Sequence, residues 1–264
     1  MSKIVVIGGT GLIGTKTIAL LAADGHEAVA ASPNTGVNTI TGEGLAEVLV
    51  GAKVLVDVSN SPSFADDDVM SFFVTSTTNL IAAARAAGIA NYVALSVVGT
   101  DRLVDSGYMR AKVAQEQLIV DSGLPYSLVH ATQFFEFITG IAATATVGDE
   151  VRLPNGPVQP IAAADVAAEV ARVAEGSPLN ATVEIAGPER MGLADFVRTG
   201  LTFRDDPRTV ITDPEALYFG AIPGEDTLVP SDGATIAETR LAEWLPANSV
   251  PANSVRSKSV RSNA

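Results

Sequence analysis

The chain has 264 residues, no cysteine, two histidines and a formal net charge of -13. This length fits one α/β domain, or a nucleotide-binding domain with a smaller appended region. The negative charge opposes nucleic acid and anionic membranes as partners. Without cysteine there can be no disulfide and no thiolate nucleophile, and the wide separation of His26 and His130 predicts that there is no metal site.

No apolar run reaches the length of about 18 residues that a membrane-spanning helix needs. The first apolar run is short and interrupted by glycine, which is unlike a secretory signal. The expected location is therefore the cytoplasm.

The first predicted elements are a strand at 3–7, a glycine-rich turn and a helix at 11–23. Glycines spaced three apart allow a tight turn, let the backbone approach a pyrophosphate, and start a helix whose N–H groups face the anion. A tight turn without a ligand is the alternative interpretation. The residues expected to hold a dinucleotide are Gly8, Thr10, Gly11, Leu12, Ile13 and Gly14.

A second strand is predicted at 27–31, and Ser32-Pro33-Asn34 follows it. An acidic residue at this point would hold the ribose 2′-hydroxyl of NAD, and this chain has none. The arginine expected to pair with a 2′-phosphate is also missing there, so only Ser32 and Asn34 could hydrogen-bond the ribose. We therefore expect a mild preference for NADP(H) over NAD(H).

Further β-rich segments alternate with helical ones along the next hundred residues. This alternation predicts an α/β fold with a doubly wound parallel sheet. The loop at 57–62, which contains Asp57, Ser59 and Asn60, follows the fourth β-rich segment and is expected beside the adenine and inner ribose, unless it is an ordinary loop. The segments are predicted strands at 37–40, 54–58, 91–96 and 126–131 and predicted helices at 43–50, 68–87 and 109–122.

Three residues in this region could carry acid–base chemistry. Tyr108 and Lys112 are four positions apart, so on a helix both project from one face. A nearby cation favours the phenolate and lowers the pKa of a phenol toward the working range. Ser96 ends a predicted strand, where parallel sheets present ligand-binding groups. A surface pair formed by chance is the alternative for Tyr108 and Lys112.

After residue 132 the pattern changes to loops, a helix at 163–175, a strand at 181–186 and a helix near 192–200. We predict one domain over 1–245, in which residues about 133–160 and 187–245 form a small substrate-side region, and a flexible tail over 246–264. Candidate substrate contacts are His130, Gln133 and Phe134, although a structural histidine and a packed loop explain them nearly as well. Tyr218, Phe219 and Trp244 are further candidates to line the same site.

Together, Gly8-x-x-Gly11-x-x-Gly14, Ser96 and Tyr108-x-x-x-Lys112 resemble the short-chain dehydrogenase/reductase superfamily, in particular its atypical, NmrA-like NAD(P)-binding branch. The resemblance covers about residues 3 to 190 and implies a Rossmann-type fold. It implies that Tyr108 is a general acid, that Lys112 lowers its pKa and binds ribose, and that Ser96 orients the reacting oxygen. Asn79 either supports a proton-relay water or bonds backbone.

The function that this resemblance favours is an NAD(P)H-dependent oxidoreductase that reduces a carbonyl or quinone of an apolar or aromatic small molecule. One alternative is a monooxygenase of aromatic polyketide tailoring that uses NAD(P)H. The other is a non-catalytic, NmrA-like dinucleotide sensor, which has no need for Tyr108 and Lys112 at catalytic spacing. The expected partner is a small-molecule substrate, and both a monomer and a homo-oligomer remain open.

Overall fold

A computed structural model describes residues 1–248 of the chain. The expected tail therefore lies outside the described residues beyond Asn248, and helix α8 (Leu241–Ala247) continues into its first two positions. In the described part of the chain, no helix is both long and apolar enough to cross a membrane.

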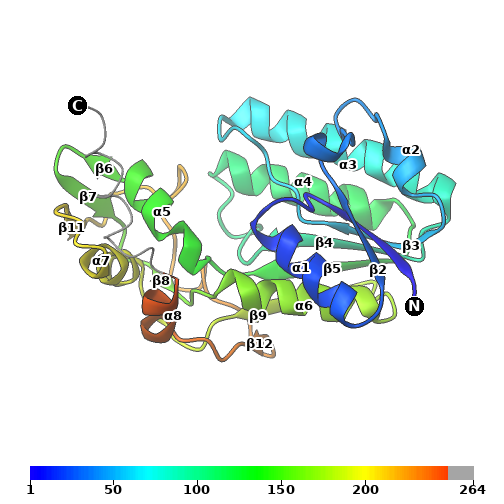
Figure 1. Cartoon of the computed structure of the whole chain (residues 1–264). Coiled ribbons are helices and arrows are strands. Elements are labelled where there is room, and N and C mark those ends of the chain that lie inside the picture. Colours follow the sequence, from blue (N-terminus) through cyan, green and yellow to red (C-terminus); the bar gives the residue numbers. More distant parts are fainter. Residues whose placement is uncertain (249–264) are drawn as a thin grey trace, which may run out of the picture.

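The centre of the molecule is a seven-stranded sheet with the strand order β12-β9-β5-β4-β3-β1-β2, in which every pairing is parallel (Figure 1). This confirms the predicted doubly wound α/β fold. The strands are β1 (Lys3–Ile7), β2 (Glu27–Ala31), β3 (Ala52–Asp57), β4 (Asn91–Val97), β5 (Tyr126–Ala131), β9 (Thr182–Ala186) and β12 (Thr235–Ile236).

Helices cover both faces of this sheet, as a parallel sheet requires. Strand β1 shows the consequence, because Ile4 and Val6 pack under α1 and α6 whereas Val5 and Ile7 pack on the opposite face. Both sets are buried, so the strand is a continuous apolar run. On one face lie α1 (Leu12–Ala23) and α6 (Ala163–Glu175), and on the other lie α2 (Leu45–Val48), α3 (Asp66–Ala87) and α4 (Gly107–Asp121).

The strand predicted at 37–40 is wrong, because this segment forms turns. Asn38 is the physical reason: its side-chain oxygen accepts the N–H of Ile40 at 2.9 Å and that of Thr41 at 3.3 Å, and its carbonyl accepts the N–H of Gly42 at 2.9 Å. Such local bonds compete with strand pairing. Strand β2 therefore remains the edge of the sheet.

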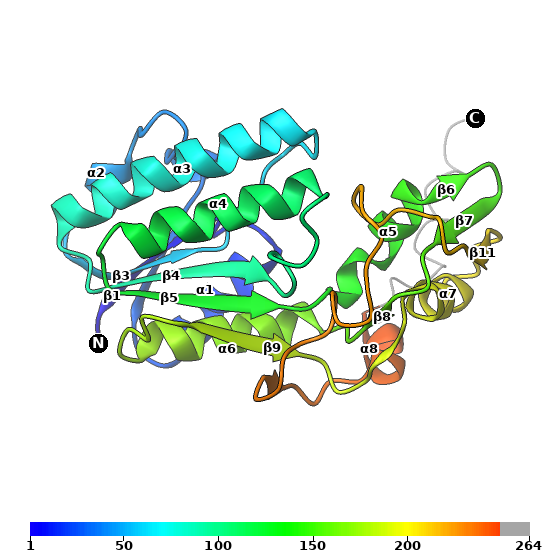
Figure 2. The same cartoon turned by 180° about the vertical axis from the view of Figure 1, so that it is seen from behind.

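A second region follows β5 and has its own hydrophobic core, in which Trp244 packs against Phe135 at a ring distance of 5.5 Å. It lies beyond the carboxyl ends of the central strands (Figure 2). A three-stranded sheet, β11-β7-β6, and the pair β10-β8 form its β structure. Its elements are η2 (Phe135–Phe137), α5 (Ile138–Thr144), β6 (Thr146–Val147), β7 (Glu150–Leu153), β8 (Pro157–Val158), β10 (Met191–Gly192), α7 (Leu193–Phe203), β11 (Thr209–Thr212) and α8.

Candidate active site

The candidate site lies where the central strands end and the second region begins (Figure 2). Strand β2 lies on one side of β1, and β3, β4 and β5 lie on the other, so the strand order reverses direction at β1. In open parallel sheets, ligands bind outside the carboxyl ends of the strands at such a switch point. Most of the residues predicted for the site fall at this edge, on loops, on the ends of helices or of strands β4 and β5, or on α4 above it.

The turn after β1 is shaped by backbone packing at its glycines. Gly8 has a φ of +75°, and a β-carbon there would lie 2.9 Å from the Ser59 nitrogen. A β-carbon on Gly14 would lie 2.3 Å from the Gly8 oxygen, and one on Gly9 would lie 2.7 Å from the α-carbon of Ala30. Only glycine fits these positions, and Gly9 is a required glycine that the spacing rule missed.

Helix α1 presents a bare amino end at this turn. Gly11 is its N-cap, no side chain caps it, and its first turn holds no acidic residue. The first N–H groups of a helix have no intrahelical partner and favour an anion. Thr10, Gly11 and Leu12 are exposed, whereas the Ile13 side chain is buried in the core, so Ile13 can offer only its backbone. These features fit the pyrophosphate of a dinucleotide.

The residues after β2 start a short helix, η1 (Pro33–Thr35). Ser32 is buried, and its N–H donates to Thr35 Oγ1 at 2.9 Å. Asn34 is exposed on η1. Both side chains lie one strand away from the glycine turn, where a ribose of the dinucleotide would be held.

The loop after β3 is tied to a buried carboxylate. Asp57, 1% exposed, accepts the Ser59 N–H at 3.0 Å, the Ser59 hydroxyl at 2.6 Å and the Gln115 side-chain amide at 3.1 Å. The Ser59 hydroxyl therefore shapes the loop that backs onto Gly8. Sequence reasoning placed Asp57 at the start of this loop but predicted no role for its carboxylate, although its place at a strand end was the available signal.

Lys112 is buried between α4 and the sheet. Its ammonium donates to the Leu95 carbonyl at 3.0 Å and to Gln115 Oε1, and it lies 4.4 Å from the ring centre of Phe73. Burial lowers the pKa of Lys112 to about 8, against the opposing effects of Asp57 and Glu116. The ammonium is thus directed toward β4 and Gln115.

Tyr108 reaches the loop after β3, where its hydroxyl donates to Asn60 Oδ1 at 3.1 Å. Its ring lies among those of Phe64, Phe73 and Phe219, with centroid distances of 5.8, 6.0 and 6.2 Å. Burial raises the pKa of Tyr108 to about 12. This direction is opposite to the one that the resemblance implied, and the reason is that the Lys112 ammonium bonds to other groups while rings surround the phenol.

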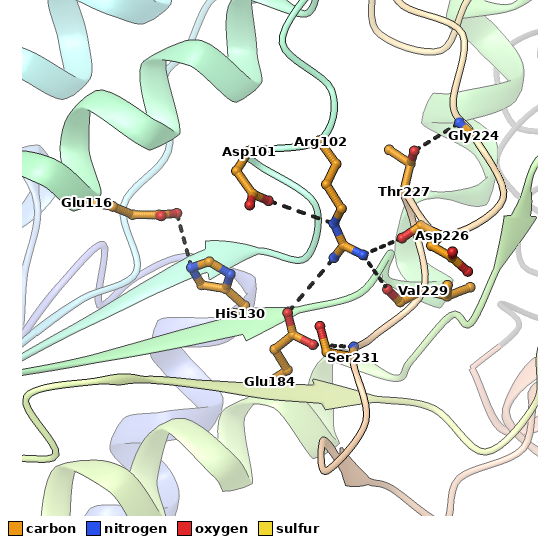
Figure 3. Close-up of polar contacts among 10 residues, drawn as sticks. All are labelled: Asp101, Arg102, Glu116, His130, Glu184, Gly224, Asp226, Thr227, Val229 and Ser231. Atoms are coloured by element: carbon orange, nitrogen blue, oxygen red, sulfur yellow. Dashed lines mark hydrogen bonds and ion pairs between the residues drawn. The ribbon is translucent and has the colours of Figure 1, made fainter.

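Ser96 and His130 are paired in the register of β4 and β5, and Glu116 of α4 lies over both. The Ser96 hydroxyl donates to Glu116 Oε1. His130 Nε2 lies 3.1 Å from the same oxygen, and Figure 3 shows this contact between His130 and Glu116. Burial raises the pKa of Glu116, but its contacts with His130, Ser96 and Lys112 outweigh this and lower it. Because the carboxylate stands between serine and histidine, this is not a serine nucleophile activated by histidine.

Glu116 is another residue that sequence reasoning missed. The available signal was its position four residues after Lys112 and eight after Tyr108, which places all three near one face of α4.

The remaining predicted contacts fall in different places. Gln133 is buried and lies beside the Tyr218 hydroxyl. Burial and the nearby Tyr108 raise the pKa of Tyr218, and the Gln133 amide offsets only part of this rise. Phe134 stacks on Phe137 at 5.0 Å and packs against the core under α6, so nothing brings it to Tyr108. Trp244 is buried in the core of the second region.

Asn79 has the structural role that was its second interpretation. Its amide donates to the carbonyls of Thr39 at 2.8 Å and Ile40 at 3.0 Å, which ties α3 to the turn after β2. Within residues 1–248, no three histidine, aspartate or glutamate side chains lie close enough together to hold a metal ion.

Comparison with known proteins yields one curated relative and many similar structures. No family model matches the chain. The Photosystem II assembly factor Ycf39 of Cyanophora paradoxa is 26% identical over 152 residues, which cover 52% of this chain and 47% of that protein. The chain therefore spans about half the length of the curated relative that it matches.

The similar solved structures share the whole architecture at low sequence identity. A short-chain dehydrogenase/reductase superfamily protein from Agrobacterium tumefaciens with bound NAD is 16% identical, with a TM-score of 0.67 over 93% of this chain and 95% of that one. A dTDP-4-dehydrorhamnose reductase from Bacillus anthracis in complex with NADP is 12% identical, with a TM-score of 0.65 over 92% of each chain. A UDP-N-acetylglucosamine 4-epimerase from Bacillus cereus is 18% identical, with a TM-score of 0.64 over 81% of this chain and 85% of that one.

The protein is thus of the Rossmann-type α/β class, with the fold of the short-chain dehydrogenase/reductase superfamily. The predicted resemblance to that superfamily is confirmed at the level of the fold, and the atypical, NmrA-like branch stays a prediction.

Proposed function

We propose that the protein is an NAD(P)H-dependent oxidoreductase of the short-chain dehydrogenase/reductase type that reduces a carbonyl or quinone of an apolar small molecule. One observation carries the proposal. In the loop after β3, the Ser59 backbone packs against Gly8 of the glycine turn, and the next residue, Asn60, accepts the Tyr108 hydroxyl. A proton donor therefore lies directly beside the place where a dinucleotide fits.

The glycine turn and the amino end of α1 would hold the pyrophosphate, and Ser32 and Asn34 would hold the adenosine ribose. A reduced nicotinamide held there would supply the hydride that the reduction of a carbonyl carbon requires. Similar structures with bound NAD and with bound NADP support a nicotinamide dinucleotide as the cofactor. The mild preference for NADP(H) rests on Ser32 and Asn34 alone.

The pKa of Tyr108 favours reduction over oxidation. With a pKa of about 12, the phenol is protonated at neutral pH, so it can give a proton to the oxygen of a carbonyl as it is reduced. The same pKa makes Tyr108 a poor base for the reverse reaction. Asn60, as its hydrogen-bond acceptor, orients the hydroxyl.

Lys112 and Ser96 act in this proposal as positioning residues. Lys112 links α4 to the Leu95 carbonyl, and the Ser96 hydroxyl donates to Glu116 of the same helix. Both bonds hold the helix that carries Tyr108 against β4. A direct contact of Lys112 with ribose, or of Ser96 with the reacting oxygen, requires these bonds to be exchanged when ligands bind.

The replacement Tyr108→Phe tests the proposal, with calorimetric titration of NADPH and NADH and with turnover of two carbonyl probes, menadione and 1-tetralone. We expect kcat/KM to fall at least ~100-fold, because general-acid catalysis contributes about 10²–10⁴-fold. The dissociation constant of NADPH should change less than about twofold. Tyr126→Phe, at the start of β5, is the matched control and should leave both quantities unchanged. Unchanged turnover in Tyr108→Phe, or binding of neither dinucleotide, would contradict the proposal.

A second candidate function is a dinucleotide-binding protein that acts through a partner protein. It is favoured by the relative that is named as an assembly factor. In that case the protein would bind NADPH or NADH and turn over neither probe, and Tyr108→Phe would alter nothing that is measured above.

A further inference from the structure

Residues 218–221 form a tight turn whose backbone is unusual for its sequence. The Tyr218 N–H donates to the Ala221 carbonyl at 2.7 Å, and the Ala221 N–H donates back at 3.2 Å. The two central residues, Phe219 and Gly220, have φ values of +48° and +86°, as in a type I′ turn. Glycine suits this conformation, but phenylalanine does not, because its β-carbon is crowded there.

Among residues 1–248, only two other non-glycine residues have a positive φ, and these are Asn180 and Asp205. Asparagine and aspartate are the residue types that tolerate this conformation. Phe219 is therefore a genuine exception, and backbone strain of this kind persists where the surroundings enforce it, often at functional sites.

The strained turn brings the Phe219 ring to the proposed proton donor. Its centroid lies 6.2 Å from that of Tyr108 and 5.7 Å from that of Phe64, and the Phe64 and Tyr108 rings are 5.8 Å apart. Each ring therefore contacts the other two at distances typical of aromatic pairs. The loop after β3 and the turn of the second region thus meet over Tyr108.

Packing alone does not account for this arrangement, because both outer rings remain in contact with solvent. Phe64 is 56% exposed and Phe219 is 36% exposed. Leu217 and Ile222, which flank this turn, are each 56% exposed. A turn with a strained backbone thus holds apolar side chains at the surface beside Tyr108, and exposed apolar surface of this kind marks binding sites.

We propose that Phe64 and Phe219 determine the substrate specificity of the enzyme by stacking on a flat, unsaturated ring of the substrate. The proposal rests on the proposed role of Tyr108 as proton donor. Both rings pack on Tyr108 and are exposed, so a substrate whose carbonyl reaches the Tyr108 hydroxyl meets their solvent-facing surface, where a planar ring gains aromatic contacts. A hydroxyl-rich sugar there would lose its water hydrogen bonds without replacement.

The test compares two bicyclic ketones, 1-tetralone and 1-decalone, which share a skeleton and a carbonyl but differ in having one aromatic ring. We expect the aromatic ketone to show a KM about tenfold lower than the saturated one, because aromatic pairs contribute up to about 1.5 kcal/mol and 1.4 kcal/mol is tenfold. Phe219→Asn and Phe64→Leu should each reduce this ratio to about threefold or less. Phe203→Leu, at an exposed phenylalanine of α7, is the matched control and should preserve the ratio.

Two further measurements separate this proposal from the proposed function. Asparagine tolerates the positive φ, so Phe219→Asn should raise the melting temperature by about 2–4 °C; a lower melting temperature would show that Phe219 is a packing residue and would overturn the proposal. If the protein turns over neither ketone, calorimetric binding of both to its NADP⁺ complex gives the same comparison. Equal affinities, a ratio unchanged in Phe219→Asn, or no binding of either ketone would overturn the role of the two rings.

Discussion

The glycine turn and the ring cluster around Tyr108 meet at residues 59–60, yet they are built in different ways. The turn consists of neighbours in sequence, and its shape depends on backbone contacts such as that between Gly14 and Gly8. The ring cluster joins side chains from distant segments, from Phe64 to Phe219. The glycine turn, on the dinucleotide side of the site, therefore tolerates almost no added atom. The ring cluster, on the substrate side, is held by rings and buried polar bonds whose side chains can be replaced one at a time.

The largest expected effect comes from adding one carbon atom to the turn. In Gly14→Ala, the new β-carbon would lie 2.3 Å from the Gly8 oxygen and 2.6 Å from the Gly9 α-carbon. Backbone on both sides cannot move aside cheaply, so the free energy of unfolding should fall by about 3 kcal/mol. NADPH binding should be lost as well. Urea unfolding and calorimetric titration measure the two effects.

The second region offers a matched control for this change. Gly140 lies in α5 with nothing within 4 Å of an added β-carbon, so Gly140→Ala should stabilise the protein by about 0.5–1 kcal/mol. A similar small effect of Gly14→Ala would break the comparison, because the turn would then be as adaptable as an exposed helix.

The same difference explains which parts of the structure could be predicted from the sequence. Strands β1 and β2 were predicted with the observed bounds, because buried parallel strands are continuous apolar runs and glycines end the first of them. The glycine turn was predictable because its glycine spacing lies within one short segment, whereas the need for Gly9, which packs against Ala30 of β2, was missed. The segment 37–40 was not, because Asn38 diverts an apolar, β-rich stretch into turns.

The substrate side was only partly predictable, for a physical reason. Tyr108 was identified from its spacing to Lys112, but the direction of its pKa depends on rings that come from three other segments. The Lys112 ammonium bonds to a strand carbonyl and to Gln115, and the spacing of residues along the helix does not predict which of the nearby acceptors it bonds. Phe64 carried no signal at all, because its role exists only in the folded chain.

A pH titration of stability sharpens the comparison, because the buried Lys112 ammonium makes the free energy of unfolding depend on pH, whereas the glycine turn contains no titratable side chain. Lys112 has a pKa of about 8 in the folded protein and 10.5 as its ordinary value. Between these values the unfolded chain binds more protons, so the free energy of unfolding should rise with pH by ~2 kcal/mol from pH 8 to 10. Lys112→Met should lack this rise. Urea unfolding at several pH values measures it.

Lys53→Met provides the control, since Lys53 is an exposed lysine of β3. Its unfolding curve should keep the rise between pH 8 and 10. If the difference in the free energy of unfolding between wild type and Lys112→Met stayed constant across this window, burial would not penalise the ammonium, and its bonds to Leu95 and Gln115 would compensate its desolvation in full.

The smallest expected effect concerns Glu116, which links the Ser96 hydroxyl to His130. The pKa of Glu116 lies below its ordinary value of 4.5, so its charged form stabilises the folded protein above that value, and the contribution is lost as the pH falls through the lowered pKa. In Glu116→Gln an amide replaces the carboxylate, and its oxygen can still accept the hydrogen bond of the Ser96 hydroxyl. The free energy of unfolding at pH 7 should therefore fall by only about 1–2 kcal/mol.

The acid limb of the stability curve distinguishes this role from simple packing. Between pH 5 and pH 3, wild type should lose more stability than Glu116→Gln, because only wild type has this carboxylate to protonate. Glu47→Gln, at an exposed glutamate of α2, should follow the wild-type curve. Parallel acid limbs in wild type and Glu116→Gln would mean that the carboxylate gains nothing from Ser96 and His130. The substrate side would then depend on its rings and on the bonds of Lys112, and its contrast with the backbone-packed glycine turn would rest on those side chains.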